Sequence, residues 1–320
     1  MRQKILRELV KNRDTFISGS ELASYLGISR VAVWKHIEAL KEEGYEIIGV
    51  SGKGYHLDNV GVILADDIKT SLKGQLIGQE IIYYPRLDSS SEALKRHLKQ
   101  RKIEEGTVYV AGKQDKGKGR RGRLWESPFG GLWFSFILYP NLPMFQMALL
   151  SLTFAVALTR SLQPYLGAVC IKWPNDVYCN GKKIAGILLE VSGEVDRAEY
   201  LITGIGINLN LKHKDLPNHI ASTATSLLEE GGQMIAHNDM LINVLSYLNN
   251  YYFKFLHYGF TFFRTEFKSL CLHLGKEIEV SKGQQFIKGI NSDIDEMGNL
   301  IITNEHGQVS ISTGDVRVIN

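Results

Sequence analysis

The stretch Gln114–Gly131 (QDKGKGRRGRLWESPFGG) combines glycines with cationic side chains, most densely in its centre, Gly117–Arg123. Glycine lets successive backbone N–H groups point into one concavity that binds anions. Arginine adds a planar guanidinium whose paired N–H groups fit the oxygens of a phosphate or a carboxylate. The pattern therefore predicts a mobile loop that closes over an anionic ligand. The alternative is a solvated basic loop without a ligand, which is the commoner role of a charged segment.

The same glycines, Gly117, Gly119 and Gly122, also spell G-x-G-x-x-G, the fingerprint of dinucleotide-binding folds. That fingerprint requires a helix that begins within the glycines and an acidic residue about 20 positions further on. Here Pro128 and two more glycines follow, and then the apolar run Leu132–Leu138. We therefore set a dinucleotide-binding fold aside.

Three short motifs further along the chain could complete a cleft for an anion. Lys172–Asp176 (KWPND) offers an amide and a carboxylate beside a rigid turn, although a capped turn with a structural tryptophan is the simpler explanation of an isolated motif. Asn180–Gly186 (NGKKIAG) contains the hairpin signal Asn-Gly and then Lys183, whose ammonium is expected in a pocket. Gly186 predicts close approach of a ligand to the strand. Gly204–Asn208 (GIGIN) repeats this pattern, so one anion-binding cleft is expected at these strand ends.

The elements that must hold these motifs form a mixed α/β domain over residues 61–273, with a mainly antiparallel sheet. The apolar patterns predict strands at Ile81–Tyr84, Thr107–Ala111, Leu132–Leu138, Val169–Ile171, Val177–Cys179, Ile184–Val191 and Tyr200–Ile207. They predict helices at Ala65–Leu72, Glu92–Lys99, Pro143–Leu162, Thr225–Glu230, Asn238–His257 and Phe260–Leu272.

Residues 1–60 have the pattern of a winged helix-turn-helix. A helix over Arg2–Lys11 is followed by Glu21–Leu26, with Ser20 as its expected N-cap, and by Arg30–Glu43, with Ser29 as its expected N-cap. Two short strands around Ser51–Gly54 complete the wing. In such a module the second helix of the motif enters the major groove of DNA. The predicted DNA contacts are Ser29, Arg30, Trp34, Lys35 and Lys53. A winged helix used only for protein contacts is the alternative.

Residues 274–320 contain five short segments with strand patterns, separated by turn residues. They are Glu277–Ser281, Gln285–Ile290, Leu300–Thr303, Val309–Ser312 and Asp315–Ile319. This spacing predicts a small barrel of SH3-like size. The complete chain is therefore expected to be an α+β protein with three domains.

Length and composition are those of a globular protein with room for an enzyme core, at 320 residues and a net charge of +3. The three cysteines lack CxxC spacing, so the sequence predicts neither a zinc site nor a disulfide framework. The expected location of the protein is therefore the reducing cytoplasm. The N-terminus has no apolar segment like that of a signal peptide. The apolar stretch Met144–Leu162 is interrupted by polar residues, so no membrane span is expected.

The motifs DSSSE (Asp88–Glu92), GKGRRGRLW (Gly117–Trp125), KWPND, NGKKIAGIL and GIGIN, in this order, closely resemble those of the biotin protein ligase family. The winged helix before them and the small barrel after them resemble its bifunctional bacterial members, the biotin operon repressors. The resemblance implies a catalytic domain of the biotin ligase fold, which is similar to class II synthetases. It also implies an ATP-dependent enzyme, with magnesium, that forms biotinyl-adenylate and transfers biotin to a lysine of a biotin carboxyl carrier domain.

The resemblance also assigns roles to single residues. It makes Lys183 and Arg120 the catalytic residues. The biotin site by resemblance consists of Ser89, Ser90, Gln114, Gly117, Lys118, Arg120, Arg121, Lys183 and Gly186. The nucleotide side consists of Trp125, Asn175, Asp176 and Asn208. No tightly bound metal is implied. The implied partners are the carrier domain, operator DNA and a second copy of the chain when biotinyl-adenylate is bound, without a membrane.

Two positions depart from the family pattern. The common arginine of the G-R-G-R loop is Lys118 here, which loses a bidentate fork. The usual amide of a Ser-Thr-Asn or Ser-Thr-Gln motif is replaced by Ser91, so no role is carried over to that position. Two other functions stay open: a ligase of the same fold acting on lipoate or octanoate, and a regulator that binds the ligand without ligating it.

Overall fold

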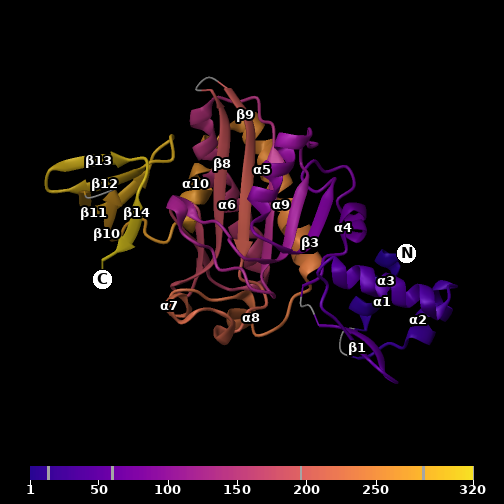
Figure 1. The fold of residues 1–320 in the computed structure, drawn as a ribbon. Coiled ribbons are helices and arrows are strands. Elements are labelled where there is room, and N and C mark those ends of the chain that lie inside the picture. Colours follow the sequence, from indigo (N-terminus) through magenta and orange to yellow (C-terminus); the bar gives the residue numbers. More distant parts are fainter. Residues whose placement is uncertain (13–14, 59–60, 195–196, 283–284, 320) are drawn as a thin grey trace.

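The computed structural model describes residues 1–12, 15–58, 61–194, 197–282 and 285–319. Three units follow one another along the chain, and the N-terminal and C-terminal units lie at opposite ends of a large central unit (Figure 1). The N-terminal unit holds a two-stranded sheet, the central unit a seven-stranded sheet and the C-terminal unit a five-stranded sheet. The expected α+β architecture is confirmed. The boundary expected at residue 60 lies outside the described residues, and the one expected at residue 273 stays a prediction.

The N-terminal unit is a winged helix-turn-helix whose helices enclose a small apolar core that includes Leu9, Val33 and Ile37. Its elements are α1 (Arg2–Lys11), α2 (Gly19–Leu26), α3 (Arg30–Glu42), β1 (Ile47–Val50) and β2 (Gly54–Leu57). The left-handed backbone of Gly27 (φ 64°) makes the tight turn between α2 and α3, which a side chain would strain.

The two helices of the motif begin at serine caps, one of which differs from expectation. Ser29 caps α3 as expected, since its hydroxyl accepts the N–H of Ala32 at 3.1 Å. The expected cap of α2 is wrong, because Ser18 and not Ser20 holds that position. The Ser18 hydroxyl accepts the Glu21 N–H at 3.1 Å, and the Glu21 carboxylate accepts the Ser18 N–H at 2.7 Å. This reciprocal pair starts the helix two residues earlier than the pattern indicated.

The central sheet has the strand order β3-β4-β5-β9-β8-β7-β6, and all neighbours are antiparallel except β3 and β4. Its strands are β3 (Ile81–Leu87), β4 (Val108–Gln114), β5 (Leu132–Leu138), β6 (Val169–Lys172), β7 (Asp176–Cys179), β8 (Lys182–Glu194) and β9 (Arg197–Ile207). Beside the sheet lie α4 (Ala65–Ser71), α5 (Ser90–Gln100), α7 (Asn218–Ala221) and α8 (Leu227–Gly231). The predicted elements are all present, but several differ in length: β3, β4, β8, β9 and α5 extend beyond the expected bounds, and α10 (Thr261–Leu270) is shorter than expected. Gln114 is therefore the last residue of β4 and Ser90 the first residue of α5, so a strand and a helix hold their backbones in place.

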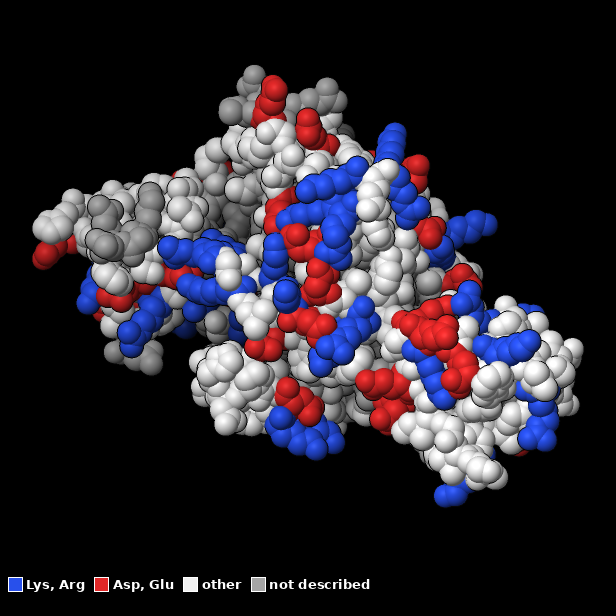
Figure 2. Space-filling view, in the orientation of Figure 1, with Lys and Arg blue, Asp and Glu red and all other residues white. Residues whose placement is uncertain are grey.

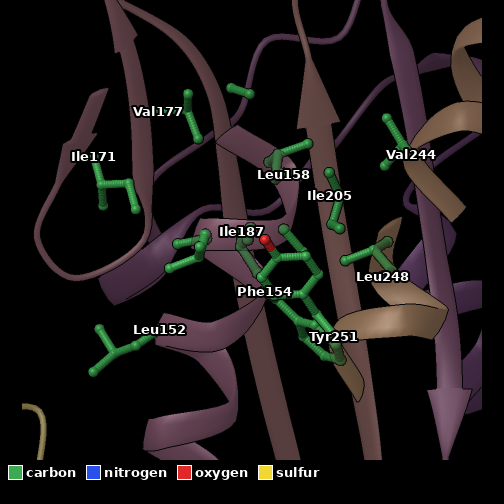
Figure 3. Packing of buried hydrophobic residues seen from close by; sticks show 14 of the residues in the cluster. Leu152, Phe154, Leu158, Ile171, Val177, Ile187, Ile205, Val244, Leu248 and Tyr251 are labelled. Atoms are coloured by element: carbon green, nitrogen blue, oxygen red, sulfur yellow. The ribbon is translucent and has the colours of Figure 1, made fainter. Parts of the chain in front are cut away.

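The two faces of this sheet differ. Three helices cover one face: α6 (Met144–Leu162), α9 (His237–Tyr258) and α10 (Thr261–Leu270). Figure 3 shows Phe154 of α6 and Tyr251 of α9 packed against Ile187 and Ile205 of the sheet. Among the described residues, only the helical stretch Met144–Tyr165 is long and apolar enough to cross a membrane, and 72% of its apolar window is buried inside the protein. It is therefore a core helix. On the opposite face, α5 covers one part of the sheet and leaves another part open.

The C-terminal unit packs against the central unit through a buried polar contact. Its strands are β10 (Glu277–Lys282), β11 (Gln285–Ile294), β12 (Leu300–Asn304), β13 (Gly307–Ile311) and β14 (Asp315–Val318), in the order β13-β12-β11-β10-β14. The indole N–H of Trp173 donates to the carbonyl of Gly298 at 2.9 Å. The Trp173 backbone N–H donates to Nε2 of His273 at 3.1 Å. Trp173 is thus a structural residue between the units, as the simpler explanation of KWPND held.

Stability at acidic pH should depend on His273. Burial lowers the pKa of this imidazole from its ordinary 6.5 to about 4, and a protonated ring could not accept the Trp173 N–H. In the unfolded chain His273 becomes protonated below about pH 6.5, whereas in the folded chain it becomes protonated only near pH 4. We expect the free energy of unfolding to fall by on the order of 3 kcal/mol as pH drops through this window.

Denaturant unfolding of the His273→Gln variant, measured between pH 7 and pH 4, checks this account. The variant should lose that part of the pH dependence that His273 causes. The exposed His306 provides the matched control, since His306→Gln should retain the wild-type decline. An equally steep decline in His273→Gln would show that another group is responsible.

Candidate active site

The open part of the sheet carries glycines where other strands carry side chains. Gly186 of β8 pairs with Gly206 of β9, and Gly204 pairs with Ser135 of β5. Because these positions lack Cβ atoms, a cavity of about 150 Å³ lies directly on the sheet. Its walls come from the start of α5, the end of β4, the glycine- and arginine-rich segment 117–125 (the Gly/Arg loop), the β7–β8 hairpin and the start of β14. The cleft expected at these strand ends is therefore present.

One end of the cavity is a cluster of buried hydroxyl groups around Gln114. Ser90 donates to Oε1 of Gln114 through its N–H at 2.8 Å and its hydroxyl at 3.0 Å. The Ser90 hydroxyl also lies 2.7 Å from that of Ser135, and the hydroxyls of Ser89 and Ser91 lie 3.1 Å apart. All four serines are buried. This neutral, pre-formed set of donors and acceptors suits a polar, uncharged part of a ligand.

The Gly/Arg loop, residues 117–125, folds back on itself above the cavity. Gly119 and Arg123 are joined by a backbone hydrogen bond of 2.8 Å, and the Trp125 N–H donates to the Gly117 carbonyl at 2.9 Å. A turn at the tip places Arg121 in the left-handed region (φ 58°). The loop is therefore folded and held by backbone hydrogen bonds. The expectation that it is mobile without a ligand stays a prediction.

Trp125 lies over the paired glycines of the cavity floor. A Cβ atom on Gly206 would lie 2.5 Å from the indole Nε1, and one on Gly186 would lie 3.0 Å from Cζ3 of the same ring. The Lys183 ammonium lies 4.7 Å from the centre of the Trp125 ring. The indole Nε1 is buried without a hydrogen-bond partner among the described residues, so it can donate to a ligand. The glycines thus make room for an aromatic wall.

The opposite end of the cavity is cationic. Lys183 forms an ion pair with Asp176 at 2.8 Å, so the expected ammonium in a pocket is present but is not alone. Arg120 is half-buried, and its guanidinium donates to the side-chain oxygen of Asn175 at 3.1 Å. Burial lowers the pKa of Arg120, and the charge of Asp176 opposes that shift. A half-buried guanidinium and an ammonium that both line the cavity favour an anionic ligand.

Several predicted site residues lie elsewhere. Asn208 is buried and donates to the Thr225 carbonyl at 2.8 Å, away from the cavity wall. Gly117 is buried at the start of the loop, where a Cβ would lie 2.3 Å from the Trp125 carbonyl. Arg121 is exposed and pairs with Asp315 at 3.1 Å. Their proposed ligand contacts stay predictions. Lys118, which lines the cavity, forms an ion pair of 2.6 Å with Glu92.

Ser135 and Asp315 are among the cavity-wall residues that sequence reasoning missed. Ser135 is the polar residue inside the apolar strand LWFSFIL, and that interruption could have marked it. Asp315 comes from the C-terminal unit and binds both Arg121 and Arg123. Burial alone would raise the pKa of Asp315, but the hydrogen bond and charge of Arg123 more than offset this and hold its pKa below the usual value. No local pattern could place this carboxylate at the cavity.

The N-terminal unit contains a second candidate interface. A groove of about 760 Å³ lies between α3 and the wing, lined by Arg30, Trp34 and Lys53 among others. Ser29 and Lys35 are exposed beside it. Trp34 has 53% of its surface exposed, which is unusual for a tryptophan and typical of a binding face. Three of the five predicted DNA contacts therefore line this groove, the other two are exposed, and their contacts with DNA stay predictions.

Comparison with known proteins gives matches along the chain. The models "Biotin/lipoate A/B protein ligase family", "HTH domain" and "Biotin protein ligase C terminal domain" match residues 83–208, 1–56 and 273–318. The bifunctional ligase/repressor BirA of Bacillus subtilis is 35% identical over 99% of this chain and 98% of its own. The chain belongs to the biotin protein ligase family. The ligase/repressor BirA of Escherichia coli is 30% identical over 90% of this chain and 88% of its own.

Solved structures agree with this membership. A biotin protein ligase from Aquifex aeolicus, in complex with biotin and ATP, is 33% identical with a TM-score of 0.66. The match covers 75% of this ligase and 99% of the Aquifex chain. The match to the Bacillus subtilis bifunctional ligase/repressor also includes the N-terminal helix-turn-helix of this ligase.

Proposed function

We propose that this family member is an ATP-dependent biotin–protein ligase and a biotin-responsive repressor. In the first step an oxygen of the biotin carboxylate attacks the α-phosphorus of ATP, and pyrophosphate leaves. The product is the mixed anhydride biotinyl-5′-AMP. In the second step the neutral amine of a lysine on a biotin carboxyl carrier domain attacks the acyl carbon. An amide forms, the nitrogen loses a proton and AMP leaves.

The observation that carries this proposal is the polarity of the cavity. Buried serine hydroxyls and Gln114 form its neutral end, whereas Lys183 and Arg120 form its cationic end. Biotin has the same division, with a neutral polar ring at one end and a carboxylate at the other. Its carboxylate would then meet the α-phosphate of ATP beside the two cations. The complementarity supports biotin as the ligand and this end of the cavity as the place of reaction.

The side chains have little covalent work to do in this reaction, because both steps are displacements at an activated centre. Lys183 and Arg120 offset the negative charge that gathers on the phosphorus oxygens in the transition state. Trp125 and the loop above it keep water from the mixed anhydride. Positioning of the two anions against each other is the remaining contribution.

Magnesium would enter this site as part of the substrate. Among the residues that the structure describes, no group of three or more His, Cys, Asp or Glu side chains could hold a metal ion. Asp176 and Asp315 both reach the cavity, but each already pairs with basic side chains. The donor set therefore suits an ion that arrives on the phosphates of ATP.

Exchange of labelled pyrophosphate into ATP tests the first step with three carboxylic acids. The proposal expects exchange that depends on biotin and is at least a hundredfold slower with lipoate or octanoate. Exchange that prefers lipoate or octanoate would identify a ligase of the alternative kind. Biotin binding without any exchange would identify a regulator that lacks ligase activity.

A substitution at Gly206 should disturb ligand binding without disturbing the fold. In Gly206→Ala the new methyl group would lie 2.5 Å from Nε1 of Trp125 and displace the indole. We expect the affinity for biotin, measured by calorimetry, to fall about tenfold, in line with a modest overpacking cost. Gly167→Ala is the control, because a Cβ there meets nothing within 4 Å. Unchanged biotin affinity in Gly206→Ala would contradict the role of the paired glycines.

The second half of the proposed function is repression of transcription. The proposed location of the protein is the cytoplasm. A single winged helix reads only a short half-site, so specific binding to an operator requires a two-fold dimer. Ordering the Gly/Arg loop costs roughly 1–2 kcal/mol for each residue fixed, and the adenylate phosphate would offset that cost. We therefore propose that biotinyl-adenylate orders the loop and promotes dimerisation. A carrier domain would compete for the monomer.

Sedimentation equilibrium should accordingly show a ligand-dependent dimer. Biotin and magnesium-ATP together are expected to lower the dimer dissociation constant at least about tenfold, a modest coupling free energy between two sites. Biotin with α,β-methylene ATP is the matched control, since its α–β linkage cannot be broken and the adenylate cannot form. A weight-average mass that stays the same with both ligand mixtures would rule out adenylate-driven dimerisation.

A further inference from the structure

Lys183 lies at the end of β8 that β9 does not reach. β9 pairs with β8 only from Ala185 onward. On one side, Lys183 pairs with Tyr178 of β7. On the other side, the segment between α7 and α8 takes the place of β9. There the Lys183 N–H donates to the Thr223 carbonyl at 2.8 Å, and the Lys183 carbonyl accepts the Thr225 N–H at 2.9 Å. The position of this lysine therefore depends on a hairpin and on a loop segment.

The carboxylate of Glu230, in α8, joins these two supports. Its Oε1 accepts the Thr225 hydroxyl at 2.7 Å. Its Oε2 accepts the side-chain amide of Asn180 at 2.5 Å. Asn180 and Gly181 form the tip of the β7–β8 hairpin, and both have a left-handed backbone (φ 48° and 79°). A single side chain thus ties the hairpin tip to the segment that flanks Lys183.

The backbone of Glu230 is itself fixed. Ser226 is the N-cap of α8, and its hydroxyl accepts the Glu229 N–H at 3.1 Å and donates to the Leu211 carbonyl at 2.6 Å. The Ser226 carbonyl accepts the Glu230 N–H at 3.1 Å. Glu230 is half-buried, and it is not among the described residues that line the cavity. Any effect of this carboxylate on the reaction must therefore pass through another side chain.

A fixed backbone matters for Lys183 because its ammonium lies among other cations. Figure 2 shows Lys and Arg side chains gathered where the central unit meets the C-terminal unit. Arg120 lines the same cavity as Lys183. Burial lowers the pKa of Lys172, the charge of Asp176 opposes this shift, and the charge of Lys183 adds to it. This repulsion acts on a long and flexible side chain, so a fixed backbone limits how far the Lys183 ammonium moves.

We infer that Glu230 is a positioning residue for Lys183, which sets the rate of adenylate formation without touching a substrate. This inference rests on the proposed function, in which Lys183 offsets charge in the transition state. A displacement of about 1 Å at a reacting centre can slow a reaction by on the order of a hundredfold. Without the Glu230 bridge, the hairpin tip and the flanking segment move independently. The Lys183 ammonium then spends less time at the phosphorus oxygens.

Pyrophosphate exchange in the full-length protein tests this role. In Glu230→Ala, the maximal rate should fall about ten- to hundredfold, while the KM values for ATP and biotin stay within about twofold, because the lost interaction belongs to the transition state. Glu230→Gln should recover most of the rate. Its amide oxygen can accept the Thr225 hydroxyl, and its amide nitrogen can donate to a turned Asn180 side chain. Asn180→Gly keeps the left-handed turn and removes one of the two bonds, so it should show a smaller loss of the same kind.

A double-variant cycle separates positioning from a general structural role. In the Lys183→Ala background, Glu230→Ala should lower the residual exchange by less than about twofold, because the side chain through which it acts is absent. Glu229→Ala is the matched control, with the same change on the neighbouring residue. The exposed Glu229 carboxylate accepts the His213 N–H at 3.0 Å and does not contact the hairpin tip in the described contacts. This variant should exchange at the wild-type rate.

Three outcomes would overturn the inference. The first is an unchanged maximal rate in Glu230→Ala. The second is a higher KM for ATP at an unchanged maximal rate, which would place Glu230 in contact with the nucleotide. The third is an equal loss with and without Lys183, with a lower melting temperature and no recovery in Glu230→Gln, which would make the role structural. An absence of exchange in the wild-type protein would instead contradict the proposed function on which this inference rests.

Discussion

Replacing Lys183 by alanine is expected to slow adenylate formation by at least about a hundredfold, because a pre-organised donor at a charged transition state is worth on the order of 3 kcal/mol. The ammonium lies at the cationic end of the cavity, between the Asp176 carboxylate and the Trp125 ring. Its removal also leaves the Asp176 carboxylate unpaired and facing two anionic substrates, which adds repulsion. Pyrophosphate exchange at saturating biotin measures the effect.

The fold should survive this substitution, since the Lys183 backbone keeps its hydrogen bonds to Thr223 and Thr225. Lys182→Ala is the matched control, with the same change on the neighbouring residue, and should exchange within twofold of wild type. The double variant Asp176→Ala with Lys183→Ala separates the two contributions, because it also removes the repulsive carboxylate. Exchange within threefold of wild type in Lys183→Ala alone would contradict the assignment of this lysine.

Reversing two charges of the winged helix is expected to abolish DNA binding and leave the ligase reaction intact. Arg30 and Lys53 lie on opposite sides of the groove between α3 and the wing. Loss of each phosphate or base contact, and repulsion by the new carboxylates, should weaken binding at least about a hundredfold at moderate salt. The measurement is fluorescence anisotropy of Arg30→Glu with Lys53→Glu against a duplex enriched from a random library by the wild-type protein.

A charge reversal elsewhere on the same helix provides the control for this experiment. Lys41 lies near the C-terminal end of α3, eleven residues or roughly 16 Å along the helix from Arg30. Lys41→Glu should keep DNA affinity within threefold of wild type. Wild-type affinity in the double variant would show that this face contacts protein rather than DNA, whereas slower biotin transfer would show that the two functions share these residues.

The sequence predicted the local features of this fold best. The spacing of apolar residues and the cap at Ser29 depend on neighbours within one or two helical turns, so they can be read along the chain. The cap of α2 was misplaced because Ser18 and Ser20 are both acceptable, and only the reciprocal bond between Ser18 and Glu21 decides between them. The length of β4, and with it the position of Gln114, depends on pairing with the distant β3.

The site was predictable where its residues lie in a recognisable motif and not where they meet through the fold. Lys183 was expected in a pocket, but its ion pair with Asp176 requires the register of β7 and β8. Asp315 reaches the cavity only because the C-terminal unit packs beside it. Asn208 belongs to a motif, yet it does not line the cavity, and its side chain donates to the Thr225 carbonyl. The motif therefore indicates the neighbourhood of a residue, and the packing decides its contact.

The central claim is that one cavity both activates biotin and transfers it to a lysine of a carrier domain. Transfer of biotin to protein tests this claim most directly. The full-length protein would be mixed with biotin, magnesium-ATP and a biotin carboxyl carrier domain, and the carrier would be followed by intact-mass spectrometry. The account predicts that the carrier gains one biotinyl group at a single lysine, only when ATP is present, and that Lys183→Ala gives none in the same time. A carrier that stays unmodified by the wild-type protein, or one that gains lipoyl or octanoyl groups instead, would contradict it.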